Sequence, residues 1–220
     1  MSIGEQTQTH ATYDPQVFEV NNLDEAKSII LTSEKGITSD ERWKKETPFV
    51  VEQITGFFEL QEDYIVLDYG CGIGRLAKRL LRKANCCVLG IDISLTMRQL
   101  APVYVNSTLF SVCTPEVLDI MVSRGLKVDF VYAVWVLQHC FKPTNELSRI
   151  RSVLKDGGLF YVLNNCQRVV PTNKGWSNDG IDVEQQLGEM FQEVWSSPIP
   201  EWLIVPEAPR MTFQKLYRKD

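Results

Sequence analysis

The chain has 220 residues and a formal net charge of -5, with 44% hydrophobic and 23% charged residues. This composition is that of an ordinary globular protein, and the length suits one domain with a full hydrophobic core. The net negative charge argues against a large basic surface, so we expect no nucleic-acid partner and no association with an anionic membrane.

The first twenty residues are polar, and we expect them to form a flexible arm, followed by an interrupted helical segment that ends near residue 60. A regular alternation of strands and helices begins after that, which predicts a parallel sheet with helices on both faces. We therefore divide the chain into residues 1–60 and a core domain over residues 61–220. Strands are expected at 64–69, 86–92, 108–112, 129–134 and 159–164, and helices at 74–83, 95–104, 115–124 and 144–154, the second of these helices ending near Pro102.

The carboxyl-terminal part begins with a loop rich in Pro, Asn and Gly. A helix at 183–190 and two short strands at 192–196 and 212–217 follow, and we expect these strands to close the sheet as an antiparallel pair.

The cysteines and the amino-terminal sequence indicate an intracellular protein. The six cysteines show no Cys-x-x-Cys spacing, which favours reduced thiols over a disulfide framework or a zinc site. The first residues carry no basic-then-apolar signal, and no apolar run approaches membrane-spanning length. We expect a cytoplasmic protein without a metal centre.

A glycine-rich turn follows the first strand of the core. Residues 68–74 read Asp-Tyr-Gly-Cys-Gly-Ile-Gly, at a junction where glycine allows a sharp bend and where backbone N–H groups can face a ligand. In a dinucleotide-binding fingerprint the third glycine comes three residues after the second, but Gly74 follows Gly72 by two. The spacing disfavours a nicotinamide cofactor.

The pattern Asp-x-Gly-x-Gly-x-Gly resembles motif I of the class I S-adenosylmethionine-dependent methyltransferases. Three further segments follow in the family's order: the strand that ends at Asp92, the segment 128–139 that ends in Leu-Gln-His, and the segment 154–162 with its Gly-Gly turn. The resemblance implies a doubly wound, mainly parallel seven-stranded Rossmann-like sheet, an amino-terminal helical lid, and S-adenosyl-L-methionine as cofactor.

The resemblance also implies a cofactor site at the carboxyl ends of the strands. Asp92 would bind the ribose and Ile93 the adenine, although Asp92 could instead belong to a helix N-terminus with Ser94 as its N-cap. The family often places an acidic residue after the third strand, where this chain has Cys113-Thr114-Pro115-Glu116. Adenine would then be recognised by backbone groups, by Thr114 or by Glu116. The expected cofactor contacts are Asp68 (to the amino group), Gly70, Cys71, Gly72, Gly74, Asp92, Ile93, Cys113, Thr114 and Val134.

His139 is the candidate catalytic base, because it is the one histidine of the core and follows the fourth strand. It could equally cap or pack the start of the next helix. The neighbouring Gln138 is a weaker candidate for binding the acceptor.

Two segments outside the sheet are expected to cover the methyl group. In the first, Arg42 could meet a carboxylate and Trp43 could shield the sulfonium, or Trp43 could simply pack on the sheet. The second, residues 164–176, is long and polar and leaves the fifth strand at the ligand edge. The expected substrate-binding residues are Arg42, Trp43, Trp135, Gln138 and Trp176.

The sequence thus predicts a metal-independent methyltransferase that acts on oxygen, nitrogen or carbon of a small or medium organic acceptor. Two alternatives stay open: a cofactor-binding but non-catalytic subunit or regulator, and an NAD(P)-dependent oxidoreductase. The identity of the acceptor and the oligomeric state stay open as well.

Overall fold

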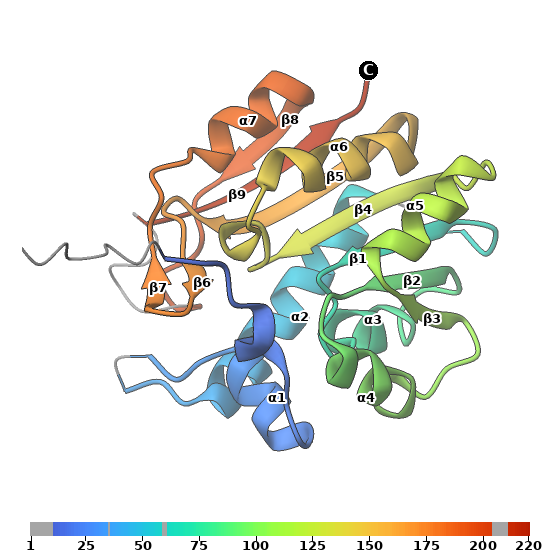
Figure 1. Ribbon diagram of the computed structural model, residues 1–220. Helices are drawn as coiled ribbons and strands as arrows, with labels where there is room; N and C mark the ends of the chain where they lie inside the picture. The colour runs from blue at the N-terminus through green and yellow to red at the C-terminus, as the bar shows by residue number, and fades with distance from the viewer. Residues whose placement is uncertain (1–10, 35, 59–60, 204–210) are drawn as a thin grey trace, which may run out of the picture.

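The computed structural model describes residues 11–34, 36–58, 61–203 and 211–220, and within these a seven-stranded sheet has the order β3-β2-β1-β4-β5-β9-β8 (Figure 1). All its neighbouring pairs are parallel except β5 with β9 and β9 with β8. This confirms the predicted fold class and the antiparallel closing pair. The strands are β1 (Ile65–Tyr69), β2 (Cys87–Ile91), β3 (Phe110–Cys113), β4 (Val128–Val134), β5 (Leu154–Asn165), β8 (Gln192–Ser197) and β9 (Thr212–Arg218).

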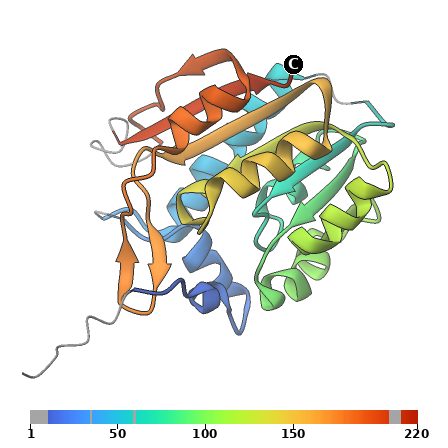
Figure 2. The same ribbon diagram turned by 45° about the horizontal axis from the view of Figure 1, so that its top comes forward.

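Helices cover both faces of the sheet, as Figure 2 shows. Val66 of β1 and Tyr132 of β4 pack with α2, α3 and α4, whereas their chain neighbours Leu67 and Val131 pack with α5, α6 and α7. Successive residues of a strand point to opposite faces, so a sheet covered on both sides requires continuous apolar runs. The helices are α1 (Leu23–Ile30), α2 (Ser39–Phe57), α3 (Arg75–Leu80), α4 (Leu95–Val105), α5 (Pro115–Ser123), α6 (Pro143–Val153) and α7 (Val183–Met190), with short 3-10 helices η1 (Pro15–Phe18) and η2 (Leu137–His139).

The second core helix, expected over 95–104, is confirmed, and it ends one residue later than expected. Helix α4 continues through Pro102 to Val105, which is buried, and ends at Asn106 in the left-handed conformation. The Asn106 N–H bonds the carbonyl of Pro102 at 2.9 Å. Burial of Val105 beside Phe110 in the core keeps the last turn helical despite the proline.

The polar segment after β5 contains a small antiparallel ribbon that the sequence analysis treats as loop. Its strands are β6 (Val170–Thr172) and β7 (Gly175–Ser177). Strands of three residues are too short to show an alternating pattern. The ribbon stands beside the amino-terminal segment, as both views of the molecule show (Figures 1 and 2).

The described part of the amino-terminal arm is held at both of its ends. At one end, the Asp14 N–H bonds the carbonyl of Pro171 in β6 at 3.0 Å. At the other end, the Glu19 carboxylate accepts from the backbone N–H groups of Leu95 and Thr96 at 2.9 and 3.0 Å, at the start of α4. We call residues 12–20 the strap, because they run from the ribbon to α4. Residues 1–10 of the expected flexible arm lie outside the described residues.

The burial of α2 against the sheet yields the first prediction. Ile54→Ala removes a fully buried side chain from α2 and should lower the free energy of unfolding by about 2–5 kcal/mol. Urea denaturation followed by circular dichroism measures this loss. The matched control is Val103→Ala on α4, whose side chain is 77% exposed and whose loss should change stability by no more than about 0.5 kcal/mol. Equal effects of the two substitutions would show that α2 does not pack on the core.

Candidate functional site

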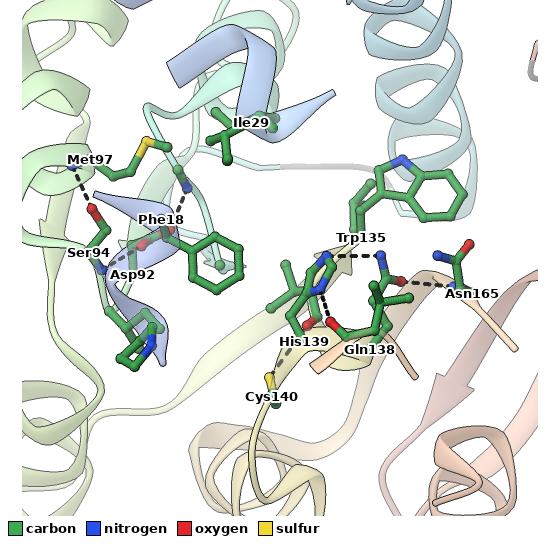
Figure 3. Close-up of a pocket in the computed structure, with 18 of the residues that line it drawn as sticks. Phe18, Ile29, Asp92, Ser94, Met97, Trp135, Gln138, His139, Cys140 and Asn165 are labelled. Atoms are coloured by element: carbon green, nitrogen blue, oxygen red, sulfur yellow. Dashed lines mark hydrogen bonds between the residues drawn. The ribbon is translucent and has the colours of Figure 1, made fainter. Parts of the chain in front are cut away.

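A cavity of about 760 Å³ opens where β1, β2 and β4 reach their carboxyl ends. Its volume is in the range of sites that enclose a cofactor or a drug-sized ligand. The walls come from the glycine-rich turn, the start of α4, the segment after β4, the strap, and the segment around the ribbon. Figure 3 shows Asp92 and His139 on opposite sides of this cavity, with Phe18 between them.

Gly70 and Gly72 of the turn line the cavity and have room for no side chain. Their φ angles are +72° and +53°, in the region that other residues rarely adopt. A Cβ on Gly70 would stand 2.3 Å from Val136, and one on Gly72 would stand 2.7 Å from Ile30. These glycines therefore allow the backbone of the turn to form the floor of the cavity.

The N–H groups of this turn are directed into the protein. Gly70 and Cys71 both donate to the Ile91 carbonyl, at 2.7 and 2.9 Å, and Gly74 donates to the Cys71 carbonyl at 2.8 Å. Gly72 donates to Asp92 Oδ2 at 2.7 Å. The expectation that the turn presents unpaired N–H groups to a ligand is wrong for these four residues.

Asp92 follows β2 and connects the turn to the start of α4. Its Oδ2 accepts from Gly72 and its Oδ1 accepts from the Ser94 N–H at 2.9 Å. Ser94 is the N-cap of α4, as one reading of the sequence expected, and its hydroxyl accepts from Met97 N–H at 3.1 Å. Burial raises the pKa of Asp92, while the two N–H donors oppose this shift. Its carboxylate still lines the cavity, beside Ile93, which is 48% exposed.

On the opposite wall, hydrogen bonds determine the tautomer of His139. A carbonyl can only accept, so the 2.6 Å contact between His139 Nδ1 and the Val169 carbonyl places the proton on Nδ1. Gln138 Oε1 accepts from the Asn165 N–H at 2.9 Å, which turns the amide NH₂ of Gln138 towards His139 Nε2 at 3.2 Å. His139 Nε2 therefore carries the lone pair, which accepts from the Gln138 amide, and both residues line the cavity.

His139 is a neutral imidazole near pH 7. Burial lowers its pKa below the ordinary value of 6.5, the Val169 carbonyl opposes that shift, and the charge of Arg168 adds to it. The N-cap of α6 is Lys142, so His139 does not cap that helix. A neutral histidine whose Nε2 carries the lone pair has the protonation state of a general base.

Aromatic rings from two other segments meet at His139. The ring of Phe18 in the strap lies 5.6 Å from the imidazole, and the ring of Trp176 in β7 lies 5.4 Å from it. Trp176 is 52% exposed, so the cluster forms the mouth of the cavity. This side of the cavity is suited to the apolar body of a ligand.

A buried carboxylate holds two other residues of the wall. Glu46 in α2 is fully buried and accepts from Arg42 Nε at 2.6 Å and from the Trp135 indole N–H at 3.0 Å. Arg42 also donates to the Thr32 carbonyl at 2.9 Å. Trp135 follows β4 with a φ of +61°, a strained conformation for a bulky residue. Glu46 thus fixes Arg42 and Trp135 against the cavity, and the carboxylate that Arg42 meets here belongs to the protein.

Several residues predicted for the site lie elsewhere. Trp43 packs against Tyr104, with ring centroids 6.3 Å apart, and its ring accepts a cation–π contact from Arg75 rather than facing the cavity. The Thr114 hydroxyl caps α5 by accepting from the Val117 N–H at 3.3 Å. The predicted residues that do not line the cavity are Asp68, Cys71, Gly74, Cys113, Thr114 and Trp43, and those that do are Gly70, Gly72, Asp92, Ile93, Val134, Arg42, Trp135, Gln138, His139 and Trp176.

Other lining residues escaped the sequence analysis because they belong to no recognisable motif. Phe18 and Glu19 stand in a polar arm, and Phe141 and Glu146 stand in an ordinary loop and helix. Next to the third strand it is Pro115 that lines the cavity. The signals that pointed to the wall on this side were the Leu-Gln-His signature and the long polar segment 164–176.

In the parts of the chain that the structure describes, no three His, Cys, Asp or Glu side chains gather as they would around a metal ion. None of the described helices has the length and apolar character that crossing a membrane requires.

Part of the chain is similar to known methyltransferases. Residues 67–162 match the family described as methyltransferase domain. The sterol 24-C-methyltransferase of Saccharomyces cerevisiae is 31% identical to this chain over 110 residues, which are 47% of the chain and 28% of the yeast protein. The chain thus spans little more than a quarter of that relative.

Solved structures share the fold at low sequence identity. Magnesium protoporphyrin IX methyltransferase from Synechocystis, solved with bound SAH, has a TM-score of 0.61 and 16% identity, with 88% of this chain and 93% of that chain covered. A geranyl diphosphate methyltransferase has a TM-score of 0.60 and 11% identity, with 84% and 81% covered. Both support the class I methyltransferase fold.

Asp68 is buried behind the turn, and its Oδ2 has no hydrogen-bond partner among the described residues. Burial raises its pKa from 3.8 to about 7, against the opposing effects of Tyr132 and Arg75. The unfolded chain therefore loses this proton near pH 4 while the folded chain keeps it up to about pH 7, so the wild type should lose stability as the pH rises through this window.

Asp68→Asn should abolish the loss of stability that the ionisation of Asp68 causes as the pH rises. Measuring Tm at about pH 5 and about pH 8 tests this. Between these two pH values, Tm should fall further in the wild type than in Asp68→Asn. Asp63→Asn, at an exposed position before β1, is the matched control and should follow the wild type. A parallel fall in Asp68→Asn and wild type would mean that Asp68 is already ionised in the folded protein at the lower pH.

Proposed function

We propose that this chain, whose residues 67–162 match a methyltransferase domain, is a class I, S-adenosylmethionine-dependent enzyme. It transfers the methyl group to an O–H or N–H group of a small or medium organic acceptor, with His139 as the base. The observation that carries the proposal is the position of Asp92 and the glycine-rich turn on one wall of a single cavity and of neutral His139 on the other.

The residues of the first wall fit the cofactor. Asp92 uses two of its lone pairs on Gly72 and Ser94, and its remaining acceptor capacity suits the two ribose hydroxyls. Ile93 offers an exposed apolar surface for the adenine. A Cβ on Gly70 or Gly72 would collide with Val136 or Ile30, side chains that line the same cavity, so glycine at both positions preserves the shape of this floor.

S-adenosylmethionine, when bound, supplies a methyl group already activated by its sulfonium charge. The protein then has to orient the acceptor, exclude water and remove a proton. His139 Nε2 can take the proton once the acceptor replaces the weak contact from Gln138, and the Val169 carbonyl stabilises the resulting imidazolium through Nδ1. Phe18 and Trp176 restrict water at the mouth. Positioning of this kind can contribute on the order of 7 kcal/mol.

The second wall favours an acceptor with a flat, apolar body. Phe18, Trp176 and the Tyr13–Phe141 stack, with centroids 5.1 Å apart, all line this side. The names of the relatives mention a sterol, protoporphyrin IX and geranyl diphosphate, which are molecules with large apolar parts. We therefore infer a phenol-like or otherwise apolar hydroxyl compound as the first class to test.

The first test of this proposal is binding of the cofactor product, S-adenosylhomocysteine, by isothermal titration. Asp92→Ala should weaken binding by about 1.5–3 kcal/mol, the range for hydrogen bonds to a charged group. Asp156→Ala, which removes an exposed carboxylate from β5, is the control and should bind as the wild type does. Wild-type binding of NAD with no binding of S-adenosylhomocysteine would refute the cofactor assignment.

The second test measures the base. His139→Gln keeps a polar side chain in the loop but removes the basic nitrogen, so transfer from tritiated S-adenosylmethionine to a panel of phenols should fall by about 10²-fold or more. Affinity for S-adenosylhomocysteine should stay within a factor of about three, because His139 lies on the other wall. Equal transfer by both proteins would remove His139 from the reaction, and cofactor binding without transfer to any acceptor would favour a non-catalytic subunit.

A further inference from the structure

We propose that Arg168 is a positioning residue that holds His139 in its Nδ1–H tautomer through a clamp that includes a bidentate ion pair with Asp179. The inference rests on the proposed function, in which His139 is the base. Arg168 lies outside the residues that line the cavity, in the segment between β5 and β6.

The guanidinium of Arg168 is buried and fully engaged. Its Nε and one terminal nitrogen donate to the two carboxylate oxygens of Asp179, both at 3.1 Å. Its other terminal nitrogen donates to the Leu137 carbonyl at 2.7 Å, and a longer contact of 3.5 Å reaches the Phe141 carbonyl. The arginine side chain is 1% exposed, so each of these partners compensates for a charge removed from water.

These contacts surround the loop that carries His139. Leu137 and Phe141 stand on either side of it in the chain, and both carbonyls turn towards the same guanidinium. The guanidinium is planar and its N–H groups have fixed directions. Because it donates to a carboxylate and two carbonyls at once, it fixes the positions of all three acceptors relative to one another. A lysine, with a single point of charge, cannot do so.

The residue after Arg168 completes the clamp. Val169 donates its N–H to the Gln138 carbonyl at 3.0 Å and accepts from His139 Nδ1 with its own carbonyl. The side chain of Arg168 and the backbone of Val169 therefore fix the same loop from two directions. If the guanidinium is lost, the Val169 carbonyl is free to shift, and the proton of the imidazole is no longer confined to Nδ1.

The clamp also joins the base to the acceptor wall. Gln167, Val169 and Trp176 line the cavity, and Arg168 connects their segment both to the His139 loop and to Asp179, beyond β7. The distance between the base and the acceptor surface is thus set by one ion pair, in which the Arg168 side chain is buried.

The histidine spectrum tests this inference without any ligand. The sequence contains only His10 and His139, so ¹⁵N-histidine labelling gives the Nδ1 and Nε2 signals of two imidazoles, and the His10→Gln variant assigns them. We expect wild-type His139 to show the neutral Nδ1–H tautomer near pH 7.5, with the proton on one nitrogen. Arg168→Gln should give a mixture of the two His139 tautomers. Arg168→Lys should show a smaller fraction of the minor tautomer than Arg168→Gln does. Asp179→Asn should also increase the fraction of the minor tautomer.

The matched control is Arg151→Gln, which also removes one arginine-to-carbonyl hydrogen bond, to Met190 at 2.6 Å, away from the cavity. Its spectrum should equal that of the wild type. If Arg168→Gln fails to fold, Asp179→Asn decides, because Asp179 is exposed and its replacement keeps the shape of the side chain. A wild-type tautomer in every folded clamp variant would overturn the inference.

Transfer to the phenol panel provides the kinetic test. Arg168→Gln should reduce turnover by about 10- to 100-fold with little change in affinity for S-adenosylhomocysteine. In a double-mutant cycle this loss should disappear when His139 is already Gln, because both changes then act on the same group. Additive losses would mean a structural role and would overturn the inference. Absence of transfer in the wild type, with the expected spectra, would count against the proposed function alone.

Discussion

The site depends on the parallel pairing of β1 with β4 at the centre of the sheet. After β1 the chain turns towards β2, and after β4 it turns towards β5, so the two connections diverge above neighbouring strand ends. The backbone cannot fill the space between diverging connections, and a cavity results at this switch in strand order. The glycine-rich turn and the His139 loop are the beginnings of those two connections, which explains why they face each other across the cavity.

The charged side chains that line the cavity are largely engaged by the protein itself. Glu46 forms an ion pair with Arg42, and the Glu19 carboxylate accepts from the backbone N–H of Leu95 at the start of α4. Arg149 pairs with Glu146, which in turn accepts from the Tyr69 hydroxyl. Charges held in this way fix the shape of the wall, since moving one would leave a partner unsatisfied in a region of low dielectric. The cavity is therefore preorganised by ion pairs that lie at its back.

The sequence was sufficient to predict the fold class and some residues of the cavity floor, namely Gly70, Gly72 and Asp92. Strand and helix periodicity, the glycine spacing and Asp92 are local signals, and the seven-stranded sheet with its antiparallel closing pair followed from the resemblance. The side walls were not predictable in the same way. Phe18 reaches His139 only because the strap crosses from the ribbon to α4, and Asp179 meets Arg168 across the ribbon. Contacts of this kind depend on tertiary placement and leave no pattern in the neighbouring residues.

Trp43 is a residue that the local sequence suggested for the site but that tertiary packing places elsewhere. Its position beside Arg42 on a helix suggested that both faced the cofactor, but neighbouring residues on a helix point in directions about 100° apart. Arg42 faces Glu46 and the cavity, whereas Trp43 faces Tyr104 and Arg75. A helix that covers an active site can therefore contribute one residue to the cavity and use the next to attach itself to the core, and α2 does both within a single turn.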